Sequence, residues 1–252
     1  MEPVYRTLEI TAKVLVAVTG TKITFQHLEH IPPTGGAVIA INHTSYVDWL
    51  PAALATSARG RRIRYLIKAE MQQVKVVNFL IKHTKTIPVD RSSGSRAYAE
   101  ALRLLMDGEL IGVMPEAGIS RSFELKEFKT GAARMALAAG VPTVPLIVWG
   151  AQRIWTKDHP RNIGRRKIPV IVAAGPPLPP SGDIEHLDAA LREAMTSLLH
   201  RVQAEYPHPE GAFWVPRRLG GSAPTVAEAK MIDDTERAER ARKRAERGGQ
   251  KE

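Results

Sequence analysis

The chain has 252 residues, with 36 Lys and Arg against 26 Asp and Glu, and it contains no cysteine. This length fits one α/β domain with a tail, and the missing cysteines exclude disulfides, thiolate metal sites and a cysteine nucleophile. The net charge of +10 favours an anionic partner, which can be a nucleic acid, a phosphorylated substrate or an anionic membrane surface.

Nucleic acid is the weakest of these partners. Aromatic residues make up only 6% of the chain, and it has no zinc-ligand pattern, no Gly-rich phosphate loop and no RNP-like aromatic motif. We therefore expect no nucleic-acid partner. A cysteine-free chain is compatible with a reducing compartment, so a cytoplasmic location is the default expectation.

The first twenty residues predict an amphipathic helix. Val4, Leu8, Leu15 and Val18 can share one helical face, and charged residues interrupt the segment. It is too short to span about 30 Å of hydrocarbon and lacks the long apolar centre of a signal peptide. Two interpretations are open for the 1–20 region: packing on the domain, or contact with a membrane interface.

After residue 22, apolar strand-like runs alternate with helix-like runs, which predicts βα units. The expected strands are 22–28, 37–41, 63–67, 86–89, 110–114, 143–149 and 167–173, and the expected helices are 46–55, 74–82, 95–106, 131–139 and 184–205. The pattern predicts a single α/β domain over 21–215, with a mostly parallel central sheet flanked by helices.

The end of the chain, 216–252, predicts a charged tail. It carries a run of alternating acidic and basic residues with little apolar surface to bury. We expect a solvated tail that is disordered or partly helical, and a basic helix that touches a membrane is the alternative.

The run Asn42-His43-Thr44-Ser45-Tyr46-Val47-Asp48 follows the expected strand 37–41, so it lies at a strand's carboxyl end. Ligands tend to bind at that edge of an open α/β sheet. A carboxylate that fixes one imidazole nitrogen lets the other take a proton near neutral pH, so His43 and Asp48 can form a general base. Ser45 and Asp48 also fit a capping box at the start of the next helix, and the two interpretations are compatible.

Charged residues follow three further strands. Lys68 and Arg91 come directly after expected strands, and Glu116, Gly118 and Arg121 follow another. Cations gathered at one sheet edge can form an oxyanion or phosphate clamp, because guanidinium groups bind phosphate bidentately. Glu116 can pair with a cation there or bind a substrate hydroxyl.

Four ordered motifs carry a family resemblance over about residues 22–180. They are Asn42-His43-Thr44-Ser45-Tyr46-Val47-Asp48, Ile87-Pro88-Val89-Asp90-Arg91, Pro115-Glu116-Ala117-Gly118-Ile119-Ser120-Arg121-Ser122 and Val141-Pro142-Thr143-Val144-Pro145, with Phe128-Lys129-Thr130-Gly131 between the last two. They resemble the blocks of the glycerolipid acyltransferases typified by bacterial 1-acylglycerol-3-phosphate acyltransferase. The third block departs from the family's P-E-G-T-R-S: Ala117-Gly118 replaces Gly-Thr, and Arg121-Ser122 comes two residues late.

The resemblance implies an O-acyltransferase of phospholipid biosynthesis. Such an enzyme moves a fatty acyl group from acyl-CoA or acyl carrier protein to the free hydroxyl of 1-acylglycerol 3-phosphate, which gives phosphatidic acid. It implies His43 as the general base and Asp48 as the residue that holds its tautomer. We expect no metal and no cofactor besides the thioester co-substrate.

The resemblance also implies an acceptor site. Lys68, Arg91 and Arg121 would hold the acceptor phosphate, and Glu116 with Gly118 would complete the pocket. The implied setting is the cytoplasmic side, peripheral on the inner face of the cell membrane, with an anionic membrane surface as partner. The segment 4–18 and the basic cluster 59–62 are candidates for the membrane contact.

Three other functions remain open. The same chemistry can serve another acceptor, such as glycerol 3-phosphate, a different lysophospholipid or a glycolipid. A binding module for membranes or nucleic acid would use the charge without His43, and the four ordered motifs argue against it. A hydrolase would use His43 to activate water, but the chain has no G-x-S-x-G elbow.

Overall fold

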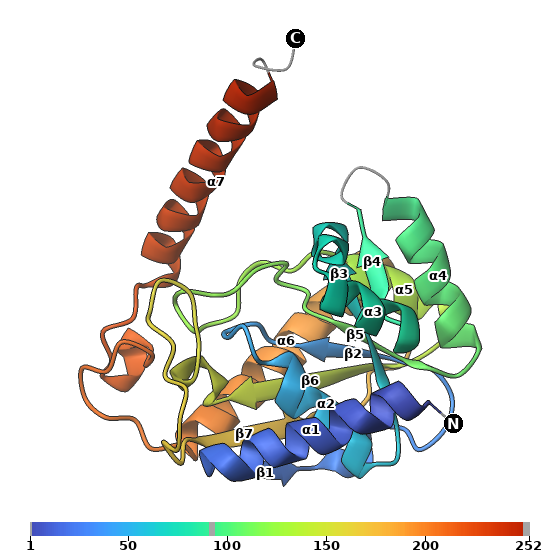
Figure 1. Cartoon of the computed structure of the whole chain (residues 1–252), viewed down its shortest axis with the longest axis horizontal. Coiled ribbons are helices and arrows are strands. Elements are labelled where there is room, and N and C mark those ends of the chain that lie inside the picture. The colour runs from blue at the N-terminus through green and yellow to red at the C-terminus, as the bar shows by residue number, and fades with distance from the viewer. Residues whose placement is uncertain (1, 91–93, 249–252) are drawn as a thin grey trace. The chain divides into compact units, whose positions relative to one another are not determined.

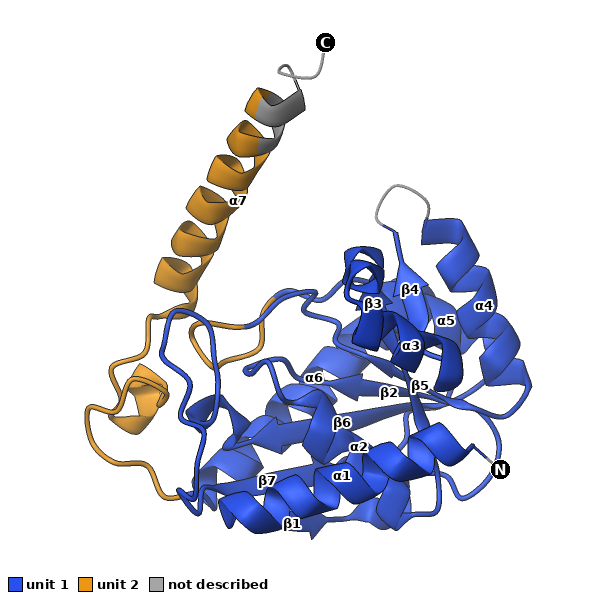
Figure 2. Ribbon diagram, in the orientation of Figure 1, with its two compact units in different colours: residues 1–119, 127–206 blue, residues 120–126, 207–252 orange. Residues whose placement is uncertain are grey.

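The computed structural model of the chain describes residues 2–90 and 94–248 (Figure 1). The chain divides into two compact units (Figure 2). Unit 1 comprises residues 1–119 and 127–206, and unit 2 comprises residues 120–126 and 207–252. Unit 2 therefore begins before the expected tail and also takes in an inner segment of the chain.

Unit 1 is built on a seven-stranded sheet in the order β1-β7-β6-β2-β5-β3-β4. The strands are β1 Lys22–Gln26, β2 Ala37–Ile41, β3 Ile63–Lys68, β4 Ile87–Val89, β5 Leu110–Val113, β6 Thr143–Trp149 and β7 Pro169–Ala174. All neighbours are parallel except β6 and β7, so the expected mostly parallel sheet is confirmed. β6 and β7 can pair antiparallel because a loop joins them, whereas a parallel neighbour requires a longer crossover.

Helices cover both faces of this sheet (Figure 1). α1 Pro3–Thr19, α2 Trp49–Ala58 and α3 Lys75–His83 lie on one face, and α4 Gly94–Met106, α5 Gly131–Ala139 and α6 Ile184–Ala204 lie on the other. The remaining long helix, α7 Val226–Gly248, belongs to unit 2, so this part of the expected tail is helical.

The core lies around the central strands. Every residue of β2 and β6 is buried, which explains why both read as continuous apolar runs without alternation. The carboxyl ends of β2 and β6 are therefore held in place by packing on both faces of the sheet. β1 ends at Gln26, earlier than expected, because His27 takes a left-handed φ of 53° that breaks the strand.

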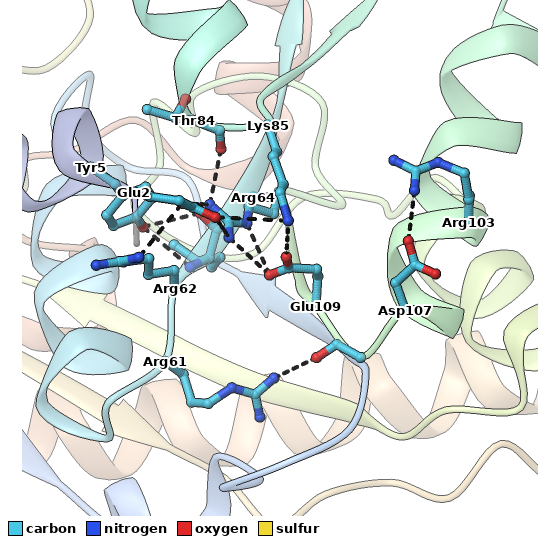
Figure 3. A network of polar contacts seen from close by, with 12 residues as sticks. Glu2, Tyr5, Arg61, Arg62, Arg64, Thr84, Lys85, Arg103, Asp107 and Glu109 are labelled. Atoms are coloured by element: carbon cyan, nitrogen blue, oxygen red, sulfur yellow. Dashed lines mark hydrogen bonds and ion pairs between the residues drawn. The ribbon is translucent and has the colours of Figure 1, made fainter.

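α1 is fastened to the sheet at its N-terminal end (Figure 3). The Tyr5 hydroxyl donates to the Ile63 carbonyl at 3.1 Å and accepts from the Ile63 N–H at 3.2 Å, and burial raises the pKa of Tyr5 to about 12. The buried Arg64 guanidinium donates to Glu2 at 2.7 Å and to Glu109 at 3.0 Å. Lys85 also donates to Glu109. One side of α1 therefore packs on the domain.

Candidate active site

Asn42 extends the pairing of β2 with β6 beyond the end of the strand. Its side-chain amide donates to the Val148 carbonyl at 3.0 Å and accepts from the Val148 N–H at 2.7 Å. The side chain thus mimics a strand residue. Asn42 is fully buried, and its two hydrogen bonds fix the point at which the turn 43–48 leaves the sheet.

Asp48 closes that turn. Its Oδ2 accepts the N–H groups of Thr44 at 2.8 Å and Ser45 at 2.7 Å, and it lies 3.2 Å from His43 Nδ1. Burial raises the pKa of the fully buried Asp48 carboxyl, and the hydrogen bonds from His43, Ser45 and Thr44 act in the opposite direction. The three groups that Asp48 binds thus all lie within five residues of it in the sequence.

The two hydrogen bonds of the predicted capping box are present: the Ser45 N–H donates to Asp48 at 2.7 Å, and the Val47 N–H donates to the Ser45 hydroxyl at 3.1 Å. The helix that they were expected to start begins later. α2 begins at Trp49, after Asp48, and the Ser45 hydroxyl points toward the carbonyls of Trp155 at 2.6 Å and Ala151 at 3.0 Å. The expected helix 46–55 therefore starts three residues later than predicted, because residues 46–48 form a turn. The predicted pairing of Asp48 with His43 is present in the structure.

His43 carries its imidazole at the carboxyl end of β2 with 19% of the side chain exposed. Its Nδ1 faces Asp48, and no described residue bonds Nε2. A proton on Nδ1 leaves the Nε2 lone pair basic and turned to a partner from outside the chain. The arrangement can therefore take a proton from a bound hydroxyl or water.

Glu116 supports the same turn. It follows β5, the parallel neighbour of β2, and its buried Oε1 accepts the His43 N–H at 2.8 Å. The carboxylate thus binds backbone. Gly118 lies in the same loop, but the left-handed φ falls on Ala117, at 53°, where the resembling family has its glycine.

Segment 151–156 after β6 holds the turn from the other side. Beside the Ser45 contacts, the Tyr46 N–H donates to the Trp155 carbonyl at 3.1 Å, and the Thr156 hydroxyl donates to the Thr44 carbonyl at 2.7 Å. The rings of Tyr46 and Trp155 pack 4.6 Å apart. Trp155 and Thr156 were not predicted as site residues, because they belong to no motif. Asn42 and Ser45 lie inside the first motif, but the sequence did not predict the contacts that they make with distant segments.

The three cations predicted to bind the acceptor phosphate are Lys68, Arg91 and Arg121, and they lie in different parts of the chain. Lys68 is the exposed last residue of β3, and β3 is parallel to β5, so Lys68 lies at the same sheet edge as the His43 turn. Arg91 lies outside the described residues; β4, which precedes it, is parallel to β3 and leads the chain to this edge.

Arg121 belongs to unit 2. Its side chain is only 7% exposed, and its guanidinium pairs with Asp233 and with Glu236, the latter at 2.9 Å, both on α7. Lys126 binds Asp233 at 2.5 Å as well. The structure therefore gives Arg121 carboxylate partners that the sequence did not predict.

The fold and this turn define an α/β protein with a histidine and a carboxylate paired at the carboxyl edge of its sheet. The family model described as Acyltransferase matches residues 22–149, about half of the chain. The chain belongs to the acyltransferase family, and the family prediction is confirmed.

Curated relatives carry one recurrent name. The 1-acyl-sn-glycerol-3-phosphate acyltransferase of Bacillus subtilis is 30% identical over 139 residues, which are 55% of this chain and 67% of that protein. A Chlamydomonas reinhardtii protein of the same name is 25% identical over 71% of this chain and 53% of its own length. The chain thus spans between about half and two thirds of these two relatives.

A solved structure shares the fold. The crystal structure of the 1-acyl-sn-glycerophosphate (LPA) acyltransferase PlsC from Thermotoga maritima aligns with a TM-score of 0.67 over 81% of each chain, at 21% identity. At this identity the similarity shows the fold alone. Among the described residues, none of the helices is both long and apolar enough to span a membrane.

Proposed function

We propose that this protein transfers a fatty acyl group from an acyl-CoA or acyl carrier protein thioester to the hydroxyl of 1-acylglycerol 3-phosphate, giving phosphatidic acid. The observation that carries the proposal is the His43–Asp48 couple, held in a closed turn at the sheet edge of an acyltransferase-family fold. The names of the relatives support the acceptor. The protein would thus act in phospholipid biosynthesis.

His43 is the general base of this reaction. Nε2 takes the proton of the acceptor hydroxyl as its oxygen attacks the thioester carbonyl, and Asp48 stabilises the imidazolium that forms. The tetrahedral intermediate collapses with loss of the thiolate, which receives the proton from Nε2. The ester bond forms, the thioester bond breaks, and no acyl-enzyme is required.

The turn itself does not supply an oxyanion hole. Each backbone N–H from Asn42 to Val47 already has an acceptor: the Leu146 carbonyl, Glu116, Asp48 twice, the Trp155 carbonyl and the Ser45 hydroxyl. Negative charge on the intermediate therefore needs a donor from another element, such as a cation. Lys68 is one such cation at this edge.

Arg91 and Lys68 are the residues to which we assign the acceptor phosphate, with Glu116 and Gly118 bordering the pocket. A guanidinium suits a phosphate monoester because it can donate two parallel hydrogen bonds. Arg91→Ala is expected to raise the apparent KM for the acceptor at least tenfold with a smaller change in kcat. Unchanged acceptor dependence would remove Arg91 from this role.

A second acceptor class has specific support. Arg121, the third cation assigned to the phosphate, is paired with two carboxylates of α7. A site with one cation fewer fits a lysophospholipid with a different head group or a glycolipid. The chemistry at His43 is the same in both cases.

The setting that we propose is peripheral, on the inner face of the cell membrane. The acceptor is a membrane lipid, and a chain with a net charge of +10 is attracted to anionic phospholipids. Membrane contact thus brings the enzyme to a concentrated pool of its substrate.

One experiment tests both the reaction and the acceptor. The full chain is given palmitoyl-CoA with lysophosphatidic acid, glycerol 3-phosphate, lysophosphatidylinositol or a monoglycosylated lipid in turn, and thiol release and lipid product are recorded. We expect the fastest release with lysophosphatidic acid and almost none with His43→Ala. Thiol release that no acceptor accelerates would indicate a thioester hydrolase and overturn the proposal.

A further inference from the structure

The loop between β6 and β7 contains an exposed stretch of positive charge. We define residues 160–167 as the basic loop; all of them are exposed, and none is acidic. Its cations are Arg161, Arg165, Arg166 and Lys167, and Ile163 among them is 66% exposed. An exposed cluster of cations around one exposed apolar side chain is the composition expected of a loop that settles on a charged interface.

The charge of the basic loop is not neutralised within the described part of the chain. No carboxylate there pairs with any of its four cations, and the Arg161 guanidinium lies 4.0 Å from the ring centre of Trp155. Three other arginines of unit 1 do have acidic partners: Arg62, Arg64 and Arg103. The positive field of the basic loop is thus directed to solvent.

The end of the basic loop that leads into β7 lies beside the C-terminal end of α1 (Figure 1). The Lys167 N–H donates to the Thr19 carbonyl at 3.3 Å, and Gly20 lies against the side chains of Lys167 and Arg165. The exposed side of α1 carries large apolar residues along its length: Ile10, Val14, Leu15 and Val18, the last 67% exposed. An apolar strip and a basic cluster thus adjoin within one unit.

The basic cluster 59–62, a candidate in the sequence, is less suited to this role. Arg61 donates to the carbonyls of Pro32, Gly35 and Gly108, and Arg62 lies 3.8 Å from the carboxylates of Glu2 and Glu9. These guanidinium groups hold loops and α1 in place. The basic loop, in contrast, has its charge available.

We propose that the basic loop and the exposed side of α1 form one docking surface for an anionic lipid bilayer. Val18 and Ile163 enter the interface, and the four cations of the basic loop meet lipid phosphates. This inference rests on the proposed function, because the acceptor is a membrane lipid. The opposite charges of the loop and of an anionic leaflet select this occupant.

The docking surface is joined to the active site. The loop that contains Trp155 leads into the basic loop, and the Trp155 carbonyl accepts hydrogen bonds from Ser45 and Tyr46 of the His43 turn. A protein docked through this loop therefore holds the turn at a set height above the lipid. Acceptor molecules that remain in the bilayer can then reach His43.

Vesicle binding tests the surface. A loop variant replaces Arg161, Arg165, Arg166 and Lys167 by Gln, and a control variant of equal charge change replaces Arg237, Arg240, Arg242 and Lys243 of α7 by Gln. We expect the loop variant to lose about 600-fold in binding to phosphatidylserine-containing vesicles at low salt, which is about fivefold for each of the four cations. We expect the control variant to lose less than about fivefold. Equal losses in the two variants, or no loss in the loop variant, would overturn the proposal.

Val18→Ser with Ile163→Ser tests the apolar half of the surface. This pair is expected to weaken binding to phosphatidylcholine vesicles and phosphatidylserine-containing vesicles by similar factors, because it removes apolar contact and no charge. Unchanged binding to both kinds of vesicle would remove α1 and Ile163 from the surface.

Activity measurements separate docking from donor binding and from the proposed function. With a short-chain lysophosphatidic acid that is monomeric in water, we expect the loop variant to keep its kcat and its KM for acyl-CoA within about twofold. With vesicle-borne acceptor, its turnover falls. A raised KM for acyl-CoA in both assays would show that the loop binds the phosphates of the donor, and would overturn docking. Wild-type protein that binds vesicles but transfers no acyl group would contradict the proposed function and leave the docking surface standing.

Discussion

Two segments that follow the neighbouring strands β2 and β5 carry charged residues that the sequence assigned to one site. In residues 42–48, Asp48 binds His43 and two backbone N–H groups within seven residues. In residues 120–126, Arg121 and Lys126 bind Asp233 of α7, more than 100 residues away. The first segment is a closed local turn, whereas the second is a long-range attachment that belongs to unit 2.

The first segment holds a reactive side chain in place, whereas the second attaches one element of the fold to another. A carboxylate that closes its own turn is in place as soon as the chain folds locally, which suits a residue that must hold an imidazole in one tautomer. A guanidinium held by two carboxylates from another helix joins elements of the fold. We therefore expect substitutions in the first segment to affect chemistry and those in the second to affect the attachment of α7.

His43→Ala carries the largest expected effect. Loss of the general base should lower kcat by about 10³-fold or more, while the turn persists because Asp48 keeps its two N–H bonds. Steady-state kinetics and the thermal midpoint measure the two effects, with His200→Ala, on the exposed side of α6, as control. A variant that retains a tenth of wild-type kcat would exclude His43 as the base.

Asp48→Asn should lower kcat by about 10²-fold, because an amide stabilises the imidazolium less than a carboxylate does. It should also destabilise the fold by about 2 kcal/mol, since the buried hydrogen bonds from Thr44 and Ser45 weaken. Urea unfolding measures the second effect. Asp107→Asn, an exposed carboxylate paired with Arg103, is the matched control and should change neither quantity appreciably.

Arg121→Met tests the second segment. It leaves Asp233 and Glu236 without their shared partner, so hydrogen exchange of the N-terminal half of α7 should accelerate by at least tenfold. The kcat and the acceptor KM should stay within about threefold of wild type. A large rise in the acceptor KM with unchanged exchange would return Arg121 to the acceptor site and remove the contrast.

Acid should weaken the ion pairs that Glu2 and Glu109 make near the start of α1. Burial alone would raise the pKa of Glu109, but Lys85 and Arg64 outweigh it and lower the pKa, and the pKa of Glu2 is lowered by Arg64 in the same way. Their contribution to stability is therefore complete above the unfolded pKa of about 4.3 and is lost as pH falls through the lower folded values. The protection factors of α1 amides, which correct for the intrinsic pH dependence of exchange, should fall below pH 4, and they should depend less on pH in Glu109→Gln. An α1 that is equally protected at pH 3 and pH 7 would contradict this.

Ala117→Gly carries the smallest expected effect. Ala117 holds a left-handed φ of 53°, which glycine adopts without the Cβ penalty. The relief is partly offset by the greater freedom of glycine in the unfolded chain, so stability should rise by less than about 1 kcal/mol. A thermal midpoint that falls would show that the Ala117 methyl group has a packing role.

Much of the fold could be predicted from sequence patterns. β2, β6 and α5 have the expected bounds, because central strands are continuous apolar runs and because Gly131 and Gly140 border a helix of small residues. The start of α2 was predicted three residues early, since periodicity does not register a turn closed by Asp48. The antiparallel pairing of β7 with β6 was also not predicted, because its direction depends on how the loop between these two strands runs.

The candidate site divides in the same way. The His43–Asp48 couple was visible because both residues lie in one short run after a buried strand. The supporting contacts of Trp155 and Thr156 were not visible, since they join segments more than 100 residues apart. The carboxylate partners of Arg121 were hidden for the same reason, because Asp233 and Glu236 lie more than 100 residues further along the chain.

The sequence by itself determined the α/β class, the acyltransferase family and the pairing of His43 with Asp48, because each depends on short-range pattern or on ordered motifs. Only the tertiary structure decided which cations have partners within the fold and which face solvent. Arg61, Arg62 and Arg121 bind carbonyls or carboxylates, whereas the cations of the basic loop are exposed. The physical reason is that a charge is neutralised only by groups close to it in space, and those groups come from distant positions in the chain.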